Sequence, residues 1–179
     1  MRRLAGPLLP LLLICFLASV PVACKRRRHR TPVQETDNGM LATMVSAADP
    51  RAETQFVKGF YPVENGAWRW TSRQFTMILR PPKLASEKGA RLVLKFSIPD
   101  LVIEKLHSMT LSAALNGVAI APQEYTKPGE LTYARDVPAS ALAGDAVKVE
   151  FTLDKALPPS PVDQRELGVI VNAAGFEVK

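Results

Sequence analysis

Cysteine and histidine are both scarce in this 179-residue sequence, which contains two of each. Two cysteines cannot supply the disulfide framework of a small secreted scaffold. Zinc sites use three or four clustered cysteine, histidine or carboxylate ligands, and no histidine or cysteine pair here has ligand spacing. The phosphate-binding loop, the dinucleotide-binding glycine pattern and the nucleophile elbow of serine hydrolases are also missing. We therefore expect no metal, no cofactor and no catalytic residues.

Excess positive charge is confined to the N-terminal thirty residues. The formal net charge is +6, but seven of the 23 basic residues precede Thr31, which leaves 16 basic and 17 acidic residues in the rest of the chain. A nucleic-acid-binding domain needs clustered positive charge to displace counterions from phosphates. The body of the chain is therefore not expected to bind nucleic acid.

The N-terminus has the layout of a secretory signal peptide. Arg2 and Arg3 precede an uncharged, apolar run from Leu8 to Cys24. The end of this run, Val20-Pro21-Val22-Ala23-Cys24, resembles the lipobox of bacterial lipoproteins. The resemblance implies a signal peptide over residues 1–23, lipidation of Cys24, and an extracytoplasmic protein that is anchored in a membrane.

Two other outcomes remain open for this segment. Pro21 stands where lipoproteins usually have a branched apolar residue, and ordinary cleavage after Ala23 would give a secreted protein. Alternatively, the 17-residue run stays uncleaved as a single-span signal anchor, at the lower edge of the length that crosses a bilayer. The basic residues from Lys25 to Arg30 would then keep the body cytoplasmic.

Residues 24–54 are predicted to form a flexible, basic tether. They lack apolar periodicity and mix charged and polar residues with alanine, glycine and proline. Next to a lipid anchor, the cluster from Lys25 to Arg30 is better suited to anionic lipid than to nucleic acid, because each positive charge near an anionic surface is worth about 1 kcal/mol.

Residues 55–179 are predicted to form one all-β domain. Apolar and polar residues alternate in short segments separated by proline, glycine and asparagine, a pattern typical of strands. Asn116-Gly117 is a type I′ hairpin signal between two of them. Only 100–107 and 138–143 look helical. Such a pattern favours an antiparallel β-sandwich or jelly roll. The expected strands cover 74–80, 91–98, 109–115, 118–120, 131–137, 147–153, 167–171 and 176–178.

The segment from Phe60 to Trp70 holds both tryptophans of the chain. Aromatic faces stack on sugar C–H groups, and a carboxylate accepts hydrogen bonds from sugar hydroxyls. The competing interpretation is that these rings fill the core and cover a sheet end. The ligand-binding hypothesis names five residues, which are Tyr61, Glu64, Trp68, Arg69 and Trp70.

The domain resembles bacterial galactose-binding-like jelly-roll modules, some of which are appended to cell-surface glycosyltransferases. The resemblance is carried by Gly59-Phe60-Tyr61-x-x-Glu64 leading to Trp68-Arg69-Trp70-Thr71, by Leu115-Asn116-Gly117, and by Asp163-x-Arg165-Glu166-Leu167-Gly168-Val169. It implies a β-sandwich, and a structural ion pair between Asp163 and Arg165 that fixes the last strand. Many such sandwiches bind glycans, although a fold alone does not imply a function.

The function predicted from the sequence is that of a membrane-tethered, extracytoplasmic β-sandwich without enzymatic activity. It would bind carbohydrate or serve as an assembly module of the cell envelope. A small hydrolase that uses a carboxylate pair is a further alternative. The main alternative is a structural lipoprotein that docks a protein partner through an exposed sheet edge and binds no sugar. Exposure of Trp68 and Trp70 separates the two, because a ligand platform needs at least one accessible indole.

Overall fold

The computed structural model describes residues 41–179. The signal peptide over 1–23, lipidation of Cys24 and the tether up to residue 40 lie outside the described residues and stay predictions. Within 41–179, no helix is long and apolar enough to cross a bilayer.

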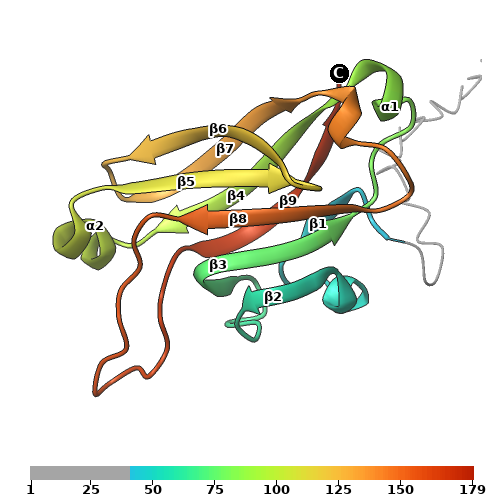
Figure 1. Cartoon of the computed structure of the whole chain (residues 1–179). Helices are drawn as coiled ribbons and strands as arrows, with labels where there is room; N and C mark the ends of the chain where they lie inside the picture. Colours follow the sequence, from blue (N-terminus) through green and yellow to red (C-terminus); the bar gives the residue numbers. More distant parts are fainter. Residues whose placement is uncertain (1–40) are drawn as a thin grey trace, which may run out of the picture. The chain divides into compact units, whose positions relative to one another are not determined.

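Within residues 41–179, nine strands form two antiparallel sheets that pack face to face, as the sequence predicted (Figure 1). The larger sheet has the strand order β2-β3-β8-β5-β6, and the smaller sheet has the order β9-β4-β7, with β1 on the free side of β9. The strands are β1 (Met44–Ser46), β2 (Phe56–Phe60), β3 (Arg69–Leu79), β4 (Ala90–Ile98), β5 (Met109–Leu115), β6 (Val118–Tyr125), β7 (Gly129–Val137), β8 (Val147–Leu153) and β9 (Ile170–Val178).

The helices in the described part of the chain are few and short. They are α1 (Ala85–Lys88), α2 (Asp100–Leu106) and two 3-10 turns, η1 (Pro50–Gln55) and η2 (Ala139–Ala141). The helix expected over 100–107 is present as α2, and the 138–143 segment is reduced to η2.

Strand β3 belongs to both sheets. Its first two residues, Arg69 and Trp70, pair with β9 in the smaller sheet. From Gln74 to Leu79 it pairs with β8 in the larger sheet. The chain from Trp68 onward therefore crosses from one layer to the other, which places the aromatic segment at an end of the sandwich.

The core lies between the sheets and is built by alternation. In β5 and β8 every second residue is buried, and the expected bounds of both strands are confirmed. Phe75 and Phe151 stack with ring centroids 5.0 Å apart, and Phe96 meets Tyr125 edge-on. Each large apolar side chain buried in this way contributes about 1.5–3 kcal/mol.

The edge strands β6 and β7 close one side of the sandwich. A bulge in β6 frees the carbonyl of Ala121, which accepts a 2.7 Å hydrogen bond from the Tyr133 hydroxyl. Tyr125 donates to the carbonyl of Thr132. Burial raises the pKa of Tyr125 to about 12 and also raises the pKa of Tyr133, so both phenols stay protonated donors at neutral pH. Side chains thus cover edges that would otherwise invite strand addition.

The Asn116-Gly117 prediction is confirmed in its geometry. Both residues have positive φ, 47° and 87°, as a type I′ turn requires. The Asn116 side chain also accepts a hydrogen bond from the backbone of Lys148, which holds the hairpin against β8.

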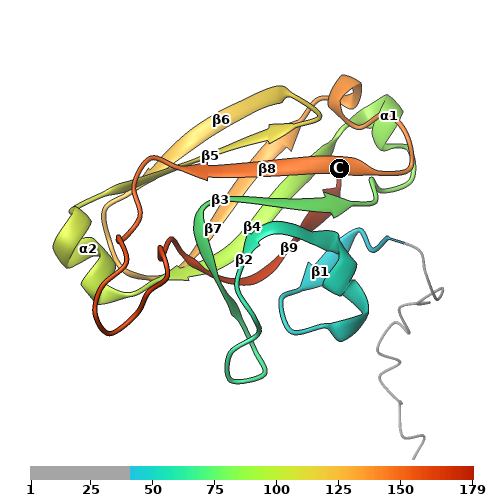
Figure 2. The ribbon, with the colours of Figure 1, turned by 60° about the horizontal axis from the view of Figure 1, so that its bottom comes forward.

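Two expected boundaries were wrong. Residues 44–54 were assigned to the tether, but β1 lies beside β9 (Figure 2) and pairs with it. Val45 and Ala47 are buried. Three residues of strand are too short to show alternation, so the sequence gives no periodic signal there. The last two expected strands are a single one, β9, because Ala173, Ala174 and Gly175 continue the strand with small side chains that hide its period.

Candidate functional site

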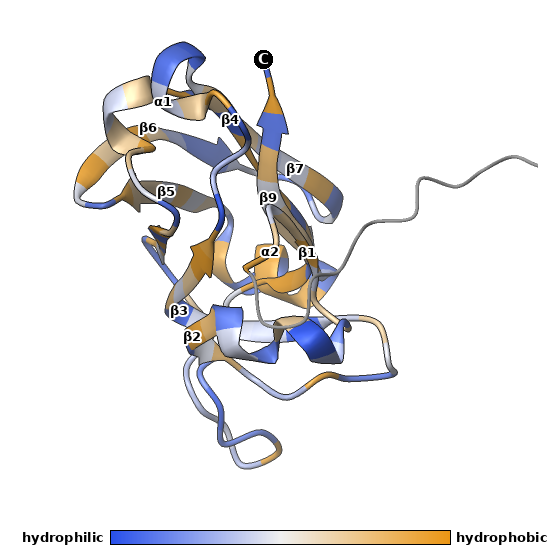
Figure 3. Ribbon diagram, turned by 90° about the vertical axis from the view of Figure 1, so that its right-hand side faces the viewer, coloured by the Kyte–Doolittle hydropathy of each residue, from blue (hydrophilic) through white to orange (hydrophobic). Residues whose placement is uncertain are grey.

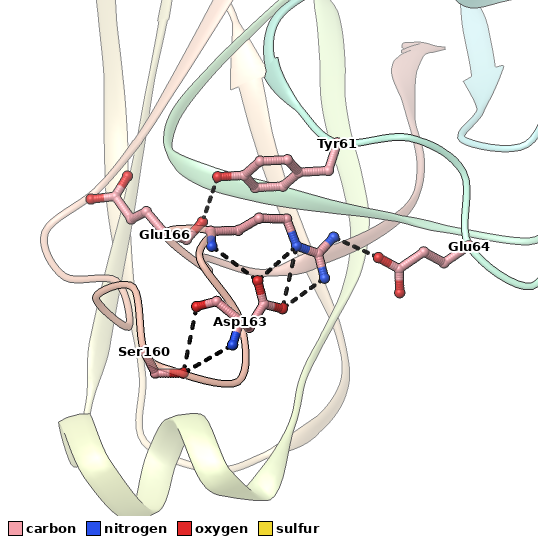
Figure 4. Close-up of polar contacts among 6 residues, drawn as sticks. Tyr61, Glu64, Ser160, Asp163 and Glu166 are labelled. Carbon is pink, nitrogen blue, oxygen red and sulfur yellow. Dashed lines mark hydrogen bonds and ion pairs between the residues drawn. The ribbon is translucent and has the colours of Figure 1, made fainter.

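Two of the five residues in the ligand-binding hypothesis, Tyr61 and Glu64, lie where two loops meet. The β2–β3 loop carries Tyr61 and Glu64, and the long β8–β9 loop carries Asp163 and Arg165. These four residues, together with Ser160 and Glu166, are drawn in Figure 4 and are called the Arg165 cluster below.

Arg165 connects the two loops. Its Nη2 donates to Asp163 Oδ2 at 2.8 Å, and its Nε donates to Asp163 Oδ1 at 3.0 Å. Its Nη1 donates to Glu64 Oε1 at 2.6 Å. The ion pair that the sequence predicted between Asp163 and Arg165 is therefore present, and Glu64 completes it as a second acceptor. A carboxylate in this position serves the guanidinium rather than an open ligand site.

Tyr61 supports the same arginine. The Arg165 guanidinium lies 5.1 Å from the centre of the Tyr61 ring, and the Tyr61 hydroxyl donates to the carbonyl of Glu166 at 2.9 Å. Hydrogen bonds from Arg165 lower the pKa of Asp163, and those to Asp163 and Glu64 raise the pKa of Arg165. Asp163 and Arg165 therefore both stay charged at neutral pH, and the cluster holds the two loops together.

The β8–β9 loop also approaches β3 very closely. Gly168 donates to the carbonyl of Thr71 at 2.7 Å, and Val169 donates to Thr71 Oγ1. A Cβ atom on Gly168 would lie 2.7–2.8 Å from atoms of Leu153, Ser72 and Thr71. This position needs glycine for space and not for its backbone conformation.

Arg69 was predicted to bind a ligand, and its burial argues against that role. Its side chain is only 5% exposed and pairs with Glu53. It also donates to the carbonyl of Ala47 at 2.8 Å and lies 4.7 Å from the centre of the Phe56 ring. The contacts that bury Arg69 come from residues 47–56, most of which the sequence assigned to the tether, so this burial was not predicted.

The two tryptophans are partly buried. Trp70 packs against the core cluster, whereas Trp68 does not belong to it and forms a bridge with Glu64. The indole nitrogen of Trp68 is buried and has no hydrogen-bond partner among residues 41–179. Neither ring forms a fully exposed platform, and the ligand-binding role of both residues stays a prediction.

A separate depression of about 560 Å³ lies on the outer face of the larger sheet. The strand register lines up the polar lining in two rows across the strands. One row is Gln74, Thr152 and Ser112. The other row is Lys58, Thr76, Glu150, Ala114 and Ala119. Neighbouring strands are about 4.8 Å apart, so each row presents its groups at regular spacing.

The depression is hollow because one half of it carries short side chains. Ala114 and Ala119 stand beside the longer Glu150, and Ser112 turns its hydroxyl to the carbonyl of Thr152. Glu150 lies 3.1 Å from the ammonium of Lys148 and remains 41% exposed. The only aromatic residue of the lining, Phe151, is buried in the core.

Sequence reasoning missed this surface. Alternation does place residues such as Gln74 and Thr76 on the solvent side of a strand. It does not reveal which strands are neighbours, and the depression exists only because five strands bring these positions together. The signal in the sequence was the run of small residues in β5, Ser112-Ala113-Ala114.

No group of three or more histidine, cysteine, aspartate or glutamate side chains is arranged for a metal ion among residues 41–179. Asp163, the acidic residue of the Arg165 cluster closest to the loop tip, is committed to Arg165.

Neither a protein-family model nor a curated protein matches the chain. Among solved structures, an acetyl xylan esterase (Est2A) from the rumen bacterium Butyrivibrio proteoclasticus aligns with a TM-score of 0.44 and 10% identity over 78% of this chain. The chain spans 34% of that esterase. The CBM36-1 domain of a multidomain xylanase from the hindgut metagenome of Trinervitermes trinervoides aligns with a TM-score of 0.42 and 9% identity, over 76% of this chain and 97% of the domain.

A carbohydrate-binding module CBM36, solved in complex with calcium and xylotriose, aligns with a TM-score of 0.39 and 10% identity, over 75% of this chain and 99% of the module. At these low scores the similarities assign neither a ligand nor a reaction to this chain.

Proposed function

We propose that this chain is a non-catalytic, membrane-tethered, extracytoplasmic module that binds a glycan in the depression on the larger sheet. The observation that carries the proposal is the double row of polar side chains that lines this hollow. The tether and its location rest on the signal peptide and Cys24, which come from the sequence.

The chemistry of the lining suits a polyhydroxylated ligand. A sugar hydroxyl both donates and accepts hydrogen bonds, and the lining offers both kinds of group. Gln74 has an amide, Thr76 and Thr152 have hydroxyls, Glu150 is an acceptor and Lys58 is a donor. The short side chains on β5 and β6 let a sugar ring approach the sheet. A flat ligand that lies across the strands would meet both rows at once.

The proposal places the ligand away from the residues that the sequence favoured. Arg69 is buried, Glu64 pairs with Arg165, and Tyr61 is hydrogen-bonded to Glu166. Opening that end to a ligand would require breaking the Arg165 cluster, whereas the depression is accessible in the folded state.

Titration of a glycan panel with two detection channels tests this proposal. Isothermal calorimetry detects binding at any site on the domain. Tryptophan emission changes only when a ligand binds near Trp68 and Trp70. We expect heat of binding without a tryptophan shift, and a loss of affinity of about tenfold or more in Glu150→Gln, since a hydrogen bond to a charged group is worth about 1.5–3 kcal/mol. Glu124→Gln, an exposed carboxylate of β6 outside the lining, is the matched control.

Two results would contradict the assignment. A glycan that shifts the tryptophan emission and binds Glu150→Gln normally would move the site to the β2–β3 loop. Absence of binding to every glycan would favour the second candidate, a protein-interaction module without a sugar ligand.

That second candidate is favoured by one observation. Glycan sites commonly use an exposed aromatic ring for stacking, and the lining of the depression offers none. A polar depression without an exposed aromatic ring also fits an extended peptide. Cross-linking of the membrane-anchored protein in cells, with a photoreactive residue at Thr76, would then capture one envelope protein, and a control at Thr132 on β7 would not.

A further inference from the structure

One end of the sandwich carries α1 and the C-terminus (Figure 1), and this end faces the viewer in Figure 3. The first described residues are fixed there as well. The carbonyl of Ala42 accepts a hydrogen bond from Arg80, and the carbonyl of Thr43 accepts one from Phe176. We call this end of the sandwich the α1 end. The opposite end carries α2 and the β8–β9 loop (Figure 1).

The two ends differ in charge. The strand ends and connections at the α1 end carry six basic residues, Arg80, Lys83, Lys88, Arg91, Lys148 and Lys179, and four acidic residues, Glu87, Asp136, Asp145 and Glu177. The adjoining turn η1, whose Gln55 bonds to Ala42 and Ile78, adds the basic Arg51 and the acidic Asp49 and Glu53, so that this end has seven basic and six acidic residues. The opposite end carries five basic residues, Arg73, Lys105, Lys127, Lys155 and Arg165, and eight acidic residues, Glu64, Asp100, Glu104, Glu124, Glu130, Asp154, Asp163 and Glu166. An anionic surface therefore attracts the first end and repels the second.

The α1 end also exposes an apolar side chain from a strained backbone. Leu84 has a φ of 64°, in the left-handed region that a leucine rarely adopts. It caps the N-terminus of α1 and its side chain remains 54% exposed, between the exposed residues Lys83 and Lys88. Folding gains nothing from burying this leucine, and glycine would fit the backbone better. An apolar residue between two lysines is the combination that binds the interface of anionic membranes.

We propose that the α1 end is a membrane-docking surface, in which Lys83 and Lys88 contact anionic phospholipid headgroups and Leu84 enters the interface. This inference rests on the membrane tether of the proposed function. The seventeen residues from Cys24 to Met40 reach at most about 60 Å when extended, so the tether alone does not orient the domain. Docking by the α1 end points the acidic end and its loops away from the membrane.

The orientation is measurable on residues 24–179 with Cys24→Ser and an N-terminal histidine tag, held on vesicles by nickel-chelating lipid. Because the experiment supplies the anchor, the result does not depend on acylation of Cys24 or on glycan binding. An environment-sensitive fluorophore is attached at Ser86→Cys in α1 or, as the matched control, at Val162→Cys, which is 96% exposed on the β8–β9 loop. Vesicles contain phosphatidylcholine alone or with about 30% phosphatidylglycerol, which supplies the anionic surface.

We expect iodide quenching of the Ser86 label to fall about threefold on anionic vesicles, because docking shields it from water. The Val162 label should stay equally quenchable on both vesicles. Equal quenching of the two labels on anionic vesicles would overturn the proposal, and so would protection of the Val162 label alone.

Two further variants separate docking from folding. The pair Lys83→Glu and Lys88→Glu should restore quenching of the Ser86 label. The pair Lys105→Glu and Lys127→Glu, with the same change in net charge at the opposite end, should leave the label protected. Leu84→Gly relieves the backbone strain and should raise the melting temperature while it weakens protection. A gain in stability with unchanged protection would remove Leu84 from the docking surface.

Discussion

Two arginine clusters lie side by side in this domain, and they share Tyr61. Arg69 is 5% exposed, contacts the Phe56 ring and binds three backbone or carboxylate partners, one of which is the carbonyl of Tyr61. Arg165 is 31% exposed and contacts the Tyr61 ring, Asp163 and Glu64. Both arginines join segments that are distant in sequence.

The difference between the two clusters is their burial. Removing the buried Arg69 leaves the carbonyl of Ala47 without its donor, in a place that water reaches poorly. The partners of Arg165 are partly exposed, so water replaces most of what they lose. We therefore expect Arg69 to stabilise the whole domain and Arg165 to stabilise mainly the two loops that it joins.

The largest effect is expected from Arg69→Met, which keeps the apolar stem and removes the guanidinium. The free energy of unfolding should fall by about 3 kcal/mol, toward the low end for a buried ion pair, because Glu53 is exposed. Chemical denaturation measures it. Arg73→Met, an exposed residue on the same strand, should change stability by less than about 0.5 kcal/mol. Equal effects of the two substitutions would refute a special role for Arg69.

The substitution Gly168→Ala tests whether close backbone packing stabilises the β8–β9 loop in addition to Arg165. The added Cβ would meet Thr71, Ser72 and Leu153 at 2.7–2.8 Å. We expect a loss of about 2 kcal/mol from overpacking. Gly144→Ala, where a Cβ would meet nothing within 4 Å but φ is +88°, should cost about 1 kcal/mol from backbone strain alone. Thermal unfolding of both variants gives the comparison.

Arg165→Ala should cost only about 1 kcal/mol, because the ion pairs are partly exposed. Its main effect should be local, with faster amide exchange in residues 154–169 and unchanged exchange in β4 and β8. A double-mutant cycle with Glu64→Gln isolates the bond between the two loops. Exchange that accelerates equally in all strands would show that Arg165 stabilises the whole domain instead.

The smallest expected effect concerns the pH dependence of amide exchange in the β8–β9 loop. The pKa of Asp163 is lowered in the folded state by its hydrogen bonds from Arg165. The contribution of ionised Asp163 to the stability of the folded loop is therefore present above the unfolded pKa of about 3.9. It is lost as the pH falls through the lower pKa of the folded state. Loop exchange should be independent of pH from 7 to about 5, once intrinsic rates are corrected, and should increase below about pH 4. Arg165→Ala should abolish this increase.

The sequence predicted the local parts of the structure well. The bounds of β5 and β8, the hairpin at Asn116 and Gly117, and α2 follow from alternation, from turn chemistry and from a short apolar segment. In each of these, residues that are close in sequence determine the conformation.

The parts that failed depend on partners far along the chain. Strand β1 exists because β9 offers it an edge about 130 residues later. Arg69 was named as a ligand residue because it lies in the aromatic segment, and its pairing with Glu53, which was assigned to the tether, was not predicted. The depression needed the register of five strands, which no single segment contains. The aromatic segment was the strongest local signal, but the structure commits Glu64, Tyr61 and Arg69 to contacts within the fold.

The pairing of β1 with β9 also has a mechanical consequence. The chain enters at the α1 end, and β1 then runs inward along β9 in the opposite direction. A pull on the N-terminal side of the domain acts lengthwise along β1. It loads the bonds between Met44–Ser46 and Ala173–Gly175 in shear, all together, instead of opening them one at a time from an end. Such a strand resists a sudden force better than its three residues suggest.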